Sequence, residues 1–296
     1  MERDVKESIL KTLVYADLFD YPLTLDEIWR FLISNKIVSK KSVKQCLASH
    51  LLSGSTIVFK NGFYFLFGRK RILDIRKRRE KESIDKFIIA QKIIKLFSYI
   101  PWVYFIGVSG SLAMRNANKE DDIDFFIVTE KNRLWITRFF LFLLLEIYGL
   151  RRKRNEKKAI NKICLNMLID EKSFLITKEN QDLFSAHEII QLVPLFDRNN
   201  TYERFINANL WFSSFLPNAL KKRGTKRNNM QNYAEPIFSM FLAVFELFAK
   251  KTQLWYMKKH RTNEIVSDGI LAFYPSDFKN KVLKRYNKLL KQYGKI

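Results

Sequence analysis

Residues 103–128 read VYFIGVSGSLAMRNANKEDDIDFFIV, and this stretch decides the fold. Two apolar runs, 103–108 and 123–128, predict two strands, because β-branched and aromatic side chains favour extended backbone. The first run leads into Gly110 and Ser111, a small-residue turn that we expect to open a short helix. About ten residues, most of them polar, separate this turn from the second run. The stretch therefore predicts a strand, a turn, a polar loop and a second strand.

Two acidic residues mark the head of the second strand. Asp122 and Asp124 stand at positions i and i+2, and strand side chains alternate between the faces of a sheet, so both carboxylates point the same way. Paired carboxylates beside a small-residue turn suit a hard divalent metal and a phosphate. Alternation places Asp121 on the opposite face, where we expect it to meet solvent.

The spacing of these residues resembles the signature of the DNA polymerase beta-like nucleotidyltransferase superfamily: Gly110 and Ser111, about ten residues, then Asp122, an apolar residue and Asp124. The resemblance implies an α+β fold with a small mixed sheet as the nucleotidyltransferase core. It also implies transfer of a nucleoside monophosphate from a nucleoside triphosphate to a hydroxyl acceptor. Asp122 and Asp124 would be catalytic and hold two Mg²⁺ ions, and Gly110 and Ser111 would bind the triphosphate.

A third carboxylate on a later strand is the usual general base in this superfamily. The strand predicted at 162–169 carries Asn166 in its middle, and the first acid is Asp170 at its end. Alternation places Asn166 and Asp170 on one face with Cys164 and Leu168. An amide cannot accept a proton, so three alternatives stay open: Asp170 is catalytic, the site works with two carboxylates, or catalysis is degraded.

Positive charge is in large excess. The chain has 53 Lys and Arg against 30 Asp and Glu, a formal net charge of +23. This excess favours nucleic acid, nucleotide or another polyanion as a partner, although Lys scattered over a solvated surface gives the same total. Arg115 and Lys119, between the turn and the acidic pair, are candidates for binding the triphosphate, and the alternative for each is a plain surface charge.

Other classes of protein fit the sequence less well. The two cysteines, Cys46 and Cys164, have neither the spacing of a metal site nor an expected disulfide partner. The N-terminus lacks the apolar segment of a signal peptide. The most apolar window, 134–150, is interrupted by Arg138 and Glu146 and predicts a buried helix rather than a membrane span. We therefore expect a cytoplasmic protein with no membrane partner.

The segment 1–67 predicts a winged-helix-like module. Thr24 and Glu27 have the spacing of a capping box, and Asn61 and Gly62 form a strong hairpin turn signal. A winged helix would present its third helix to nucleic acid, and the alternative is a module for packing or protein contacts. The basic residues expected to be exposed on that helix are Lys40, Lys41 and Lys44. The expected helices span 5–19, 25–34 and 40–52, and the expected strands span 56–60 and 63–67.

Three further regions follow along the chain. Residues 68–98 predict a connector helix, whose basic run at 69–79 is either solvated or in contact with phosphate. Residues 99–199 are the expected nucleotidyltransferase core. Residues 200–296 predict helices and no strand, with a polar basic linker at 221–232. The expected helices of these regions span 132–148, 182–191, 202–220, 236–259 and 276–293.

Two other functions stay open beside the enzyme. In the first, the chain is a nucleic-acid-binding regulator whose degenerate transferase fold senses a nucleotide, and Asn166 favours this alternative. In the second, it is a toxin–antitoxin-type transferase that modifies tRNA or a protein. For the transferase itself, the acceptor stays open among RNA, a small molecule and a protein side chain.

Overall fold

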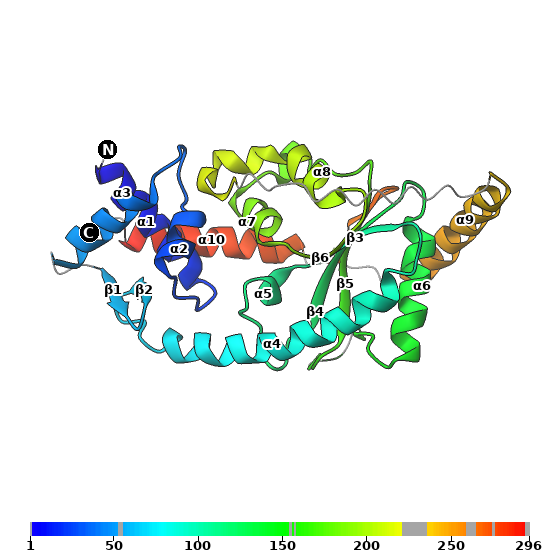
Figure 1. Cartoon of the computed structure of the whole chain (residues 1–296), viewed down its shortest axis with the longest axis horizontal. Helices are drawn as coiled ribbons and strands as arrows, with labels where there is room; N and C mark the ends of the chain where they lie inside the picture. Colours follow the sequence, from blue (N-terminus) through cyan, green and yellow to red (C-terminus); the bar gives the residue numbers. More distant parts are fainter. Residues whose placement is uncertain are drawn as a thin grey trace.

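Figure 1 shows a computed structural model of the chain. The described residues are 2–52, 56–153, 156, 158–220, 236–258, 265–273 and 276–293, and the linker predicted at 221–232 lies outside them. The helices are α1 (Glu2–Asp17), α2 (Leu25–Arg30), α3 (Lys40–Leu52), α4 (Ile72–Phe97), α5 (Gly110–Ala113), α6 (Leu134–Ile147), α7 (Leu183–Gln191), α8 (Thr201–Ala208), α9 (Pro236–Lys258) and α10 (Ser276–Tyr293). The strands are β1 (Ile57–Lys60), β2 (Phe63–Leu66), β3 (Val103–Val108), β4 (Ile123–Thr129), β5 (Ile163–Asp170), β6 (Val193–Asp197), β7 (Ile265–Val266) and β8 (Ile270–Ala272).

A mixed sheet forms the centre of the larger part of the molecule (Figure 1). Within the described residues its strand order is β6-β3-β4-β5-β8-β7, with β4 and β5 parallel and the other neighbours antiparallel. One face packs on α4, α6 and α9, and the other packs on α7 and α8. The predicted α+β class with a small mixed sheet is confirmed. The prediction of no strand after residue 200 is wrong, because β8 pairs with β5.

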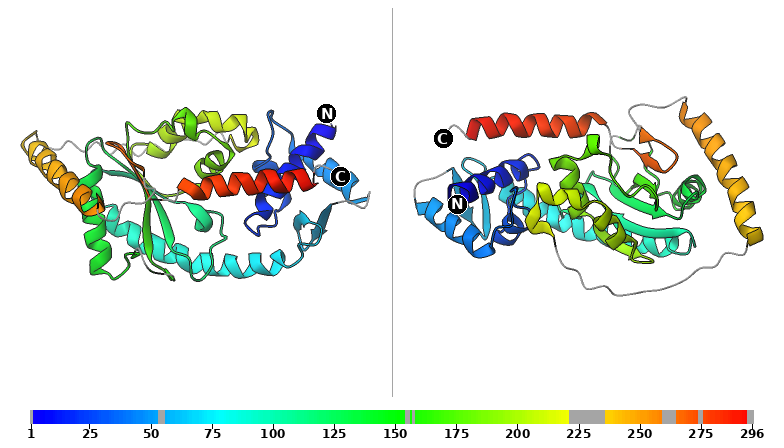
Figure 2. Two further views of the ribbon diagram at one scale, coloured as in Figure 1. Left: turned by 180° about the vertical axis from the view of Figure 1, so that it is seen from behind. Right: turned by 90° about the horizontal axis from the view of Figure 1, so that it is seen from above.

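The N-terminal part consists of α1, α2 and α3 followed by the β1–β2 hairpin. The capping box is confirmed: Glu27 N donates to Thr24 Oγ1 at 3.2 Å, and Thr24 N donates to Glu27 Oε2 at 2.8 Å. The hairpin turns at Asn61 and Gly62, which both have positive φ. α2 ends at Arg30, four residues earlier than predicted. α10 from the far end of the chain packs beside α1 (Figure 2).

The basic residues at the start of α4 are not all solvated. Arg76 is buried and donates to Glu27 Oε1 and to Glu80 Oε1, each at 2.8 Å. Arg79 donates to the Phe19 carbonyl at 2.8 Å. Residues three apart on a helix share a face, and this face of α4 is turned toward the N-terminal helices. The prediction of a solvated or phosphate-binding run is therefore wrong for Arg76 and Arg79.

The helix predicted at 202–220 is interrupted at Asn209. This side chain is fully buried, donates to the Phe174 carbonyl at 2.7 Å and accepts from Ile176 N at 3.0 Å. Asn side chains that bond to backbone groups compete with helical hydrogen bonding. The chain therefore leaves α8 after Ala208 and continues in short 3₁₀ turns.

The apolar window at 134–150 forms α6, whose first half is buried. Glu246 of α9 accepts from Trp135 N at 2.9 Å and from Ile136 N at 2.8 Å, and so caps the start of α6. The second half of α6 leaves Leu143 and Ile147 exposed, in contrast to the prediction of a buried helix. Among the described residues, no helix is both long and apolar enough to cross a membrane.

Replacing Arg76 tests the role of buried charge on α4. We expect Arg76→Met to lower the free energy of unfolding by roughly 3 kcal/mol, because it leaves the Glu27 and Glu80 carboxylates without their partner. Arg78→Met, at an exposed position of the same helix, is the matched control. It should change the free energy of unfolding by less than about 0.5 kcal/mol. Urea unfolding measures both, and equal losses in the two variants would contradict the account.

Candidate metal and phosphate site

The turn after β3 is built around Gly110. Ser109 N donates to the Asp124 carbonyl at 3.0 Å, which ties this turn to β4. Gly110 has a φ of +63°, and a Cβ atom at this position would lie 2.9 Å from Asp124 Oδ2. The left-handed backbone and the close approach both favour glycine over any residue with a side chain. The predicted turn and the predicted carboxylate Asp124 therefore lie in contact.

Asp122, Asp124 and Cys164 form an acidic cluster on one face of β4 and β5. One ligand atom from each of the three side chains lies within 4.8 Å of the others. Cys164 is paired with Asp124 in the register of the two strands, and their side chains are hydrogen-bonded. Cys164 had no expected metal role in the sequence, and the parallel strand pair is what brings it to the two acids.

Burial controls the protonation of this cluster. Loss of hydration, followed by the negative charge of Asp122, raises the pKa of Asp124 to about 8. Burial and then the charge of Asp124 raise the pKa of the Cys164 thiol well above its ordinary value. Cys164 is therefore a neutral hydrogen-bond donor to Asp124 and not a thiolate.

Arg152 is a site residue that sequence reasoning missed. Its guanidinium forms an ion pair with Asp122 at 2.5 Å, and its backbone N–H donates to Ile163 O at 3.1 Å beside β5. The negative charge of Asp122 raises the pKa of Arg152 against the effect of burial, so the guanidinium stays charged. The only sign of this contact in the sequence was the basic segment after α6. That segment does not indicate which of its Arg or Lys side chains forms an ion pair with Asp122.

The loop between the turn and the acids is held by Asp121 and Lys86. Asp121 Oδ2 accepts from Asn118 N at 2.8 Å and from Ser111 Oγ at 3.3 Å. Lys86 of α4 is buried, and its Nζ donates to the carbonyls of Asp121 at 2.6 Å and Lys119 at 3.2 Å. The prediction that Asp121 faces solvent is wrong, because its carboxylate closes this loop.

The two predicted phosphate ligands on the loop are both exposed. Arg115 has a φ of +54° just after α5, and Lys119 lies next to the acidic run. Within the described part of the chain, neither side chain forms an ion pair with Asp122 or Asp124. The arrangement brings Gly110, Asp122 and Asp124 together, and it leaves these two cations at the surface.

A β-bulge in β5 changes the face that its second half presents. Asp124 is paired with Cys164, whereas Phe126 is paired with Met167, so β5 has one more residue than β4 between these pairs. Leu168 consequently packs in the core on the face of the sheet opposite to Asp124. The predicted alternation, with Cys164 and Leu168 on one face, is wrong for this reason.

The bulge separates Asn166 from Asp170. Asn166 Nδ2 lies 3.4 Å from Ser109 Oγ, at the turn. Asp170 is paired with Thr129 at the opposite end of β4, and its Oδ1 accepts from Ser173 Oγ at 2.9 Å. Asp170 is therefore outside the acidic cluster, contrary to the expectation that it joins the pair as a third catalytic carboxylate.

The donor set of the cluster fits a hard divalent cation. Mg²⁺ prefers oxygen ligands and usually keeps several waters, so two carboxylates are a sufficient protein contribution. A soft-metal site would need a thiolate, and the Cys164 thiol is held neutral. Asp124 would give up its proton when a cation binds, which couples metal affinity to pH.

Comparison with protein-family models, with curated proteins and with solved structures finds no match for this chain.

Substituting Gly110 isolates its contact with Asp124. If the cluster holds a divalent cation, we expect Gly110→Ala to weaken its binding by roughly 10–100-fold, because the new methyl group would displace the Asp124 carboxylate. Gly149→Ala is the matched control: Gly149 has a φ of +62°, but no atom of the described residues lies within 4 Å of the position of its Cβ. Both variants bear the cost of a left-handed alanine, about 1 kcal/mol. Similar metal affinities in the two variants would refute the claimed contact.

The raised pKa of Asp124 makes stability depend on pH in the metal-free protein. The folded state holds the proton up to about pH 8, whereas an unfolded Asp loses it near its ordinary pKa of 3.8. The stabilisation is therefore complete below the ordinary pKa and is lost as pH rises toward about 8. We expect Asp124→Asn to remove this loss. The melting temperature of the variant should therefore rise relative to that of the wild type as the pH increases. Glu120→Gln, at an exposed acid, is the control, and parallel curves for Asp124→Asn and wild type would contradict the prediction.

Proposed function

We propose that the chain is a Mg²⁺-dependent nucleotidyltransferase of the DNA polymerase beta-like type. The observation that carries this proposal is the contact between Gly110 and Asp124. It brings a backbone turn that suits phosphate against a carboxylate pair that suits Mg²⁺. The strands on both sides of the motif support the same proposal, because they give Asp122 and Asp124 a common face.

Each residue of the cluster has a role in this proposal. Asp122 and Asp124 would hold Mg²⁺, and backbone N–H groups at Gly110 and Ser111 would bind oxygens of the triphosphate. Bound Mg²⁺ supplies charge neutralisation on the phosphates and on the leaving pyrophosphate. A cation held there would compete with Arg152 for Asp122, and the Arg152 guanidinium would then be available to bind a phosphate oxygen.

The acceptor is a hydroxyl group of RNA, a small molecule or a protein side chain. Its oxygen forms a bond to the α-phosphorus and loses its proton to solvent water, while the bond from that phosphorus to the bridging oxygen breaks and pyrophosphate leaves. Because Asp170 lies away from the acidic cluster, the proposed reaction works with two carboxylates. The exposed Arg115 and Lys119 remain candidates for contacts with the outer phosphates.

Metal-dependent triphosphate binding tests the proposal. We expect Asp122→Ala/Asp124→Ala to abolish Mg²⁺-dependent binding of non-hydrolysable nucleoside triphosphate analogues, because both metal ligands are removed. Isothermal titration calorimetry, with each of the four bases in turn and with and without Mg²⁺, measures the effect. Glu120→Ala removes a nearby exposed carboxylate and should leave binding unchanged. Unchanged affinity in the double variant would overturn the site.

A second candidate function is a nucleic-acid-binding regulator with a degenerate transferase fold. The remote position of Asp170 and the amide of Asn166 at the turn favour it, since neither supplies a general base at the cluster. Three helices and a hairpin are the order of a winged helix, and α3 would be its recognition helix. Its exposed polar residues include Lys41, Lys44 and Gln45.

Gel shifts with duplex DNA and with RNA test this second function. The regulator should bind in a salt-sensitive manner, and Asp122→Ala should bind as wild type does. Lys41→Glu/Lys44→Glu should lose binding, because the charges that meet phosphate are reversed. Lys77→Glu on an exposed position of α4 is the control. A wild-type protein that shifts neither nucleic acid at low salt would exclude the regulator.

A further inference from the structure

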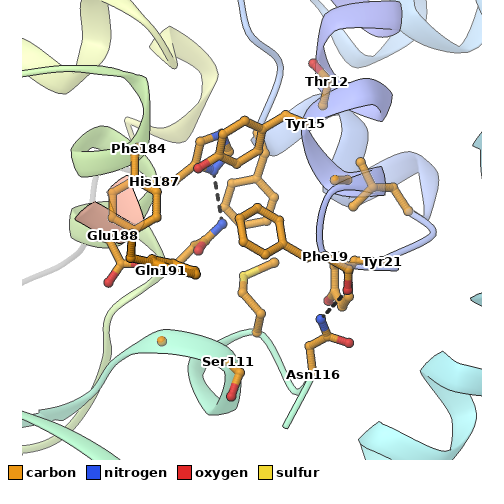
Figure 3. A pocket seen from close by; sticks show the side chains of 16 residues that line it. Thr12, Tyr15, Phe19, Tyr21, Ser111, Asn116, Phe184, His187, Glu188 and Gln191 are labelled. Carbon is orange, nitrogen blue, oxygen red and sulfur yellow. Dashed lines mark hydrogen bonds between the residues drawn. The ribbon is translucent and has the colours of Figure 1, made fainter. Parts of the chain in front are cut away.

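A cavity of about 170 Å³ lies where the N-terminal helices meet the mixed sheet domain. Its walls come from α1, α5 and α7, and α10 contributes Phe278. Figure 3 shows Tyr15, Phe19 and His187 gathered near the middle of the view, with Ser111 and Asn116 below them and Glu188 to one side. The two parts of the chain thus share one pocket, and the N-terminal part supplies seven of its sixteen lining residues.

The described walls of this cavity are largely aromatic. Among the described lining residues there is no Lys or Arg, and burial lowers the pKa of His187 to about 3, so this imidazole is neutral. The His187 ring stacks on Tyr15 with 4.1 Å between centroids. A phosphate or carboxylate would lose its hydration here without gaining a cation, so the cavity disfavours anionic ligands.

Among the described lining residues Glu188 is the one carboxyl group, and no described residue is its hydrogen-bond or ion-pair partner. Glu188 is half-buried, and loss of hydration raises its pKa to about 7. Asn116 donates to the Phe19 carbonyl at 2.9 Å, and Gln191 Nε2 lies 3.0 Å from His187 Nδ1. His187 Nε2, by contrast, is buried and has no hydrogen-bond partner among the described residues. Buried polar groups are almost always hydrogen-bonded, so the orphaned His187 Nε2 and the unpartnered, half-buried Glu188 carboxyl together indicate a ligand with a polar group such as a hydroxyl.

The cavity and the acidic cluster meet at the turn. Gly110 and Ser111 line the cavity, and the same Gly110 lies against the Asp124 carboxylate. The negative charge of Glu188 also contributes to the raised pKa of Asp124, which places the two carboxyl groups within electrostatic reach. A molecule in the cavity would therefore lie beside the residues that we assign to metal and phosphate.

We propose that this cavity binds a small, uncharged, ring-containing molecule with a hydroxyl or amine group that donates to Glu188. Its size fits, since an apolar cavity of about 150 Å³ is enough to bind benzene. This proposal goes beyond nucleotide transfer and stands without it. It gives the N-terminal helices a role as one wall of a small-molecule site.

Fluorine NMR with three matched probes tests the proposal on the full chain. 4-Fluorophenol carries the ring and the donor, 4-fluoroanisole lacks the donor, and 4-fluorobenzoate carries a negative charge. We expect 4-fluorophenol to bind roughly tenfold more tightly than 4-fluoroanisole, as one hydrogen bond to a carboxylate would give. No binding is expected for 4-fluorobenzoate. Equal binding of all three probes, or none of 4-fluorophenol, would overturn the proposal.

Variants place the bound probe in the cavity. Ala16→Phe fills the space from α1 and should abolish 4-fluorophenol binding, and Ala48→Phe, at an exposed position of α3, should not. Met114→Phe fills the cavity from the opposite side and serves if Ala16→Phe fails to fold. Glu188→Leu should remove the preference for the phenol over the anisole. Binding that survives in a folded cavity-filling variant would contradict the assignment.

Failure of this proposal is separate from failure of the proposed function. Asp122→Ala/Asp124→Ala should keep 4-fluorophenol binding, because the cavity is lined by other residues. Loss of probe binding in that double variant would show that the probe occupies the acidic cluster and would overturn the cavity site. The outcome of the triphosphate titrations does not alter either result.

Discussion

The close approach of the Gly110 backbone to the Asp124 carboxylate is the constraint on which the candidate site depends. β3 and β4 are antiparallel neighbours with Val108 paired with Phe125, so the turn that follows β3 lies beside the acids that begin β4. A backbone turn and a carboxylate can occupy this place together only when no side chain stands between them. The glycine thus matters both for its left-handed backbone and for the space it leaves.

Two cations on α4, the buried Lys86 and the half-buried Arg79, hold the surroundings of this contact. Lys86 binds the carbonyl of Asp121, and Arg79 binds both Asn116 Oδ1 in the motif loop and the Phe19 carbonyl in the N-terminal part. A desolvated cation needs partners, so these bonds fix the loop and attach the two parts of the chain to one helix. The positive charges of Lys86 and Arg79 are therefore bonded inside the protein and are not available to a polyanion.

Local patterns predicted much of this fold, because strands 103–108 and 123–128, the capping box and the hairpin depend on residues close in sequence. The partners of the acids could not be predicted in this way. Arg152 is 30 residues from Asp122 and reaches it only through the position of β5. The bulge in β5 likewise reverses the face expected for its second half. Short strands such as β8 span too few residues to show the alternation of inward and outward side chains that identifies a strand in a sequence.

The most direct measurement of the central claim is a crystal structure of the protein soaked with Mn²⁺ as a stand-in for Mg²⁺, with the metal located by its anomalous scattering. The account predicts one peak between the carboxylates of Asp122 and Asp124, with Arg152 displaced from Asp122. An intact Arg152–Asp122 pair with no peak at these carboxylates, in crystals soaked above pH 8, would contradict it.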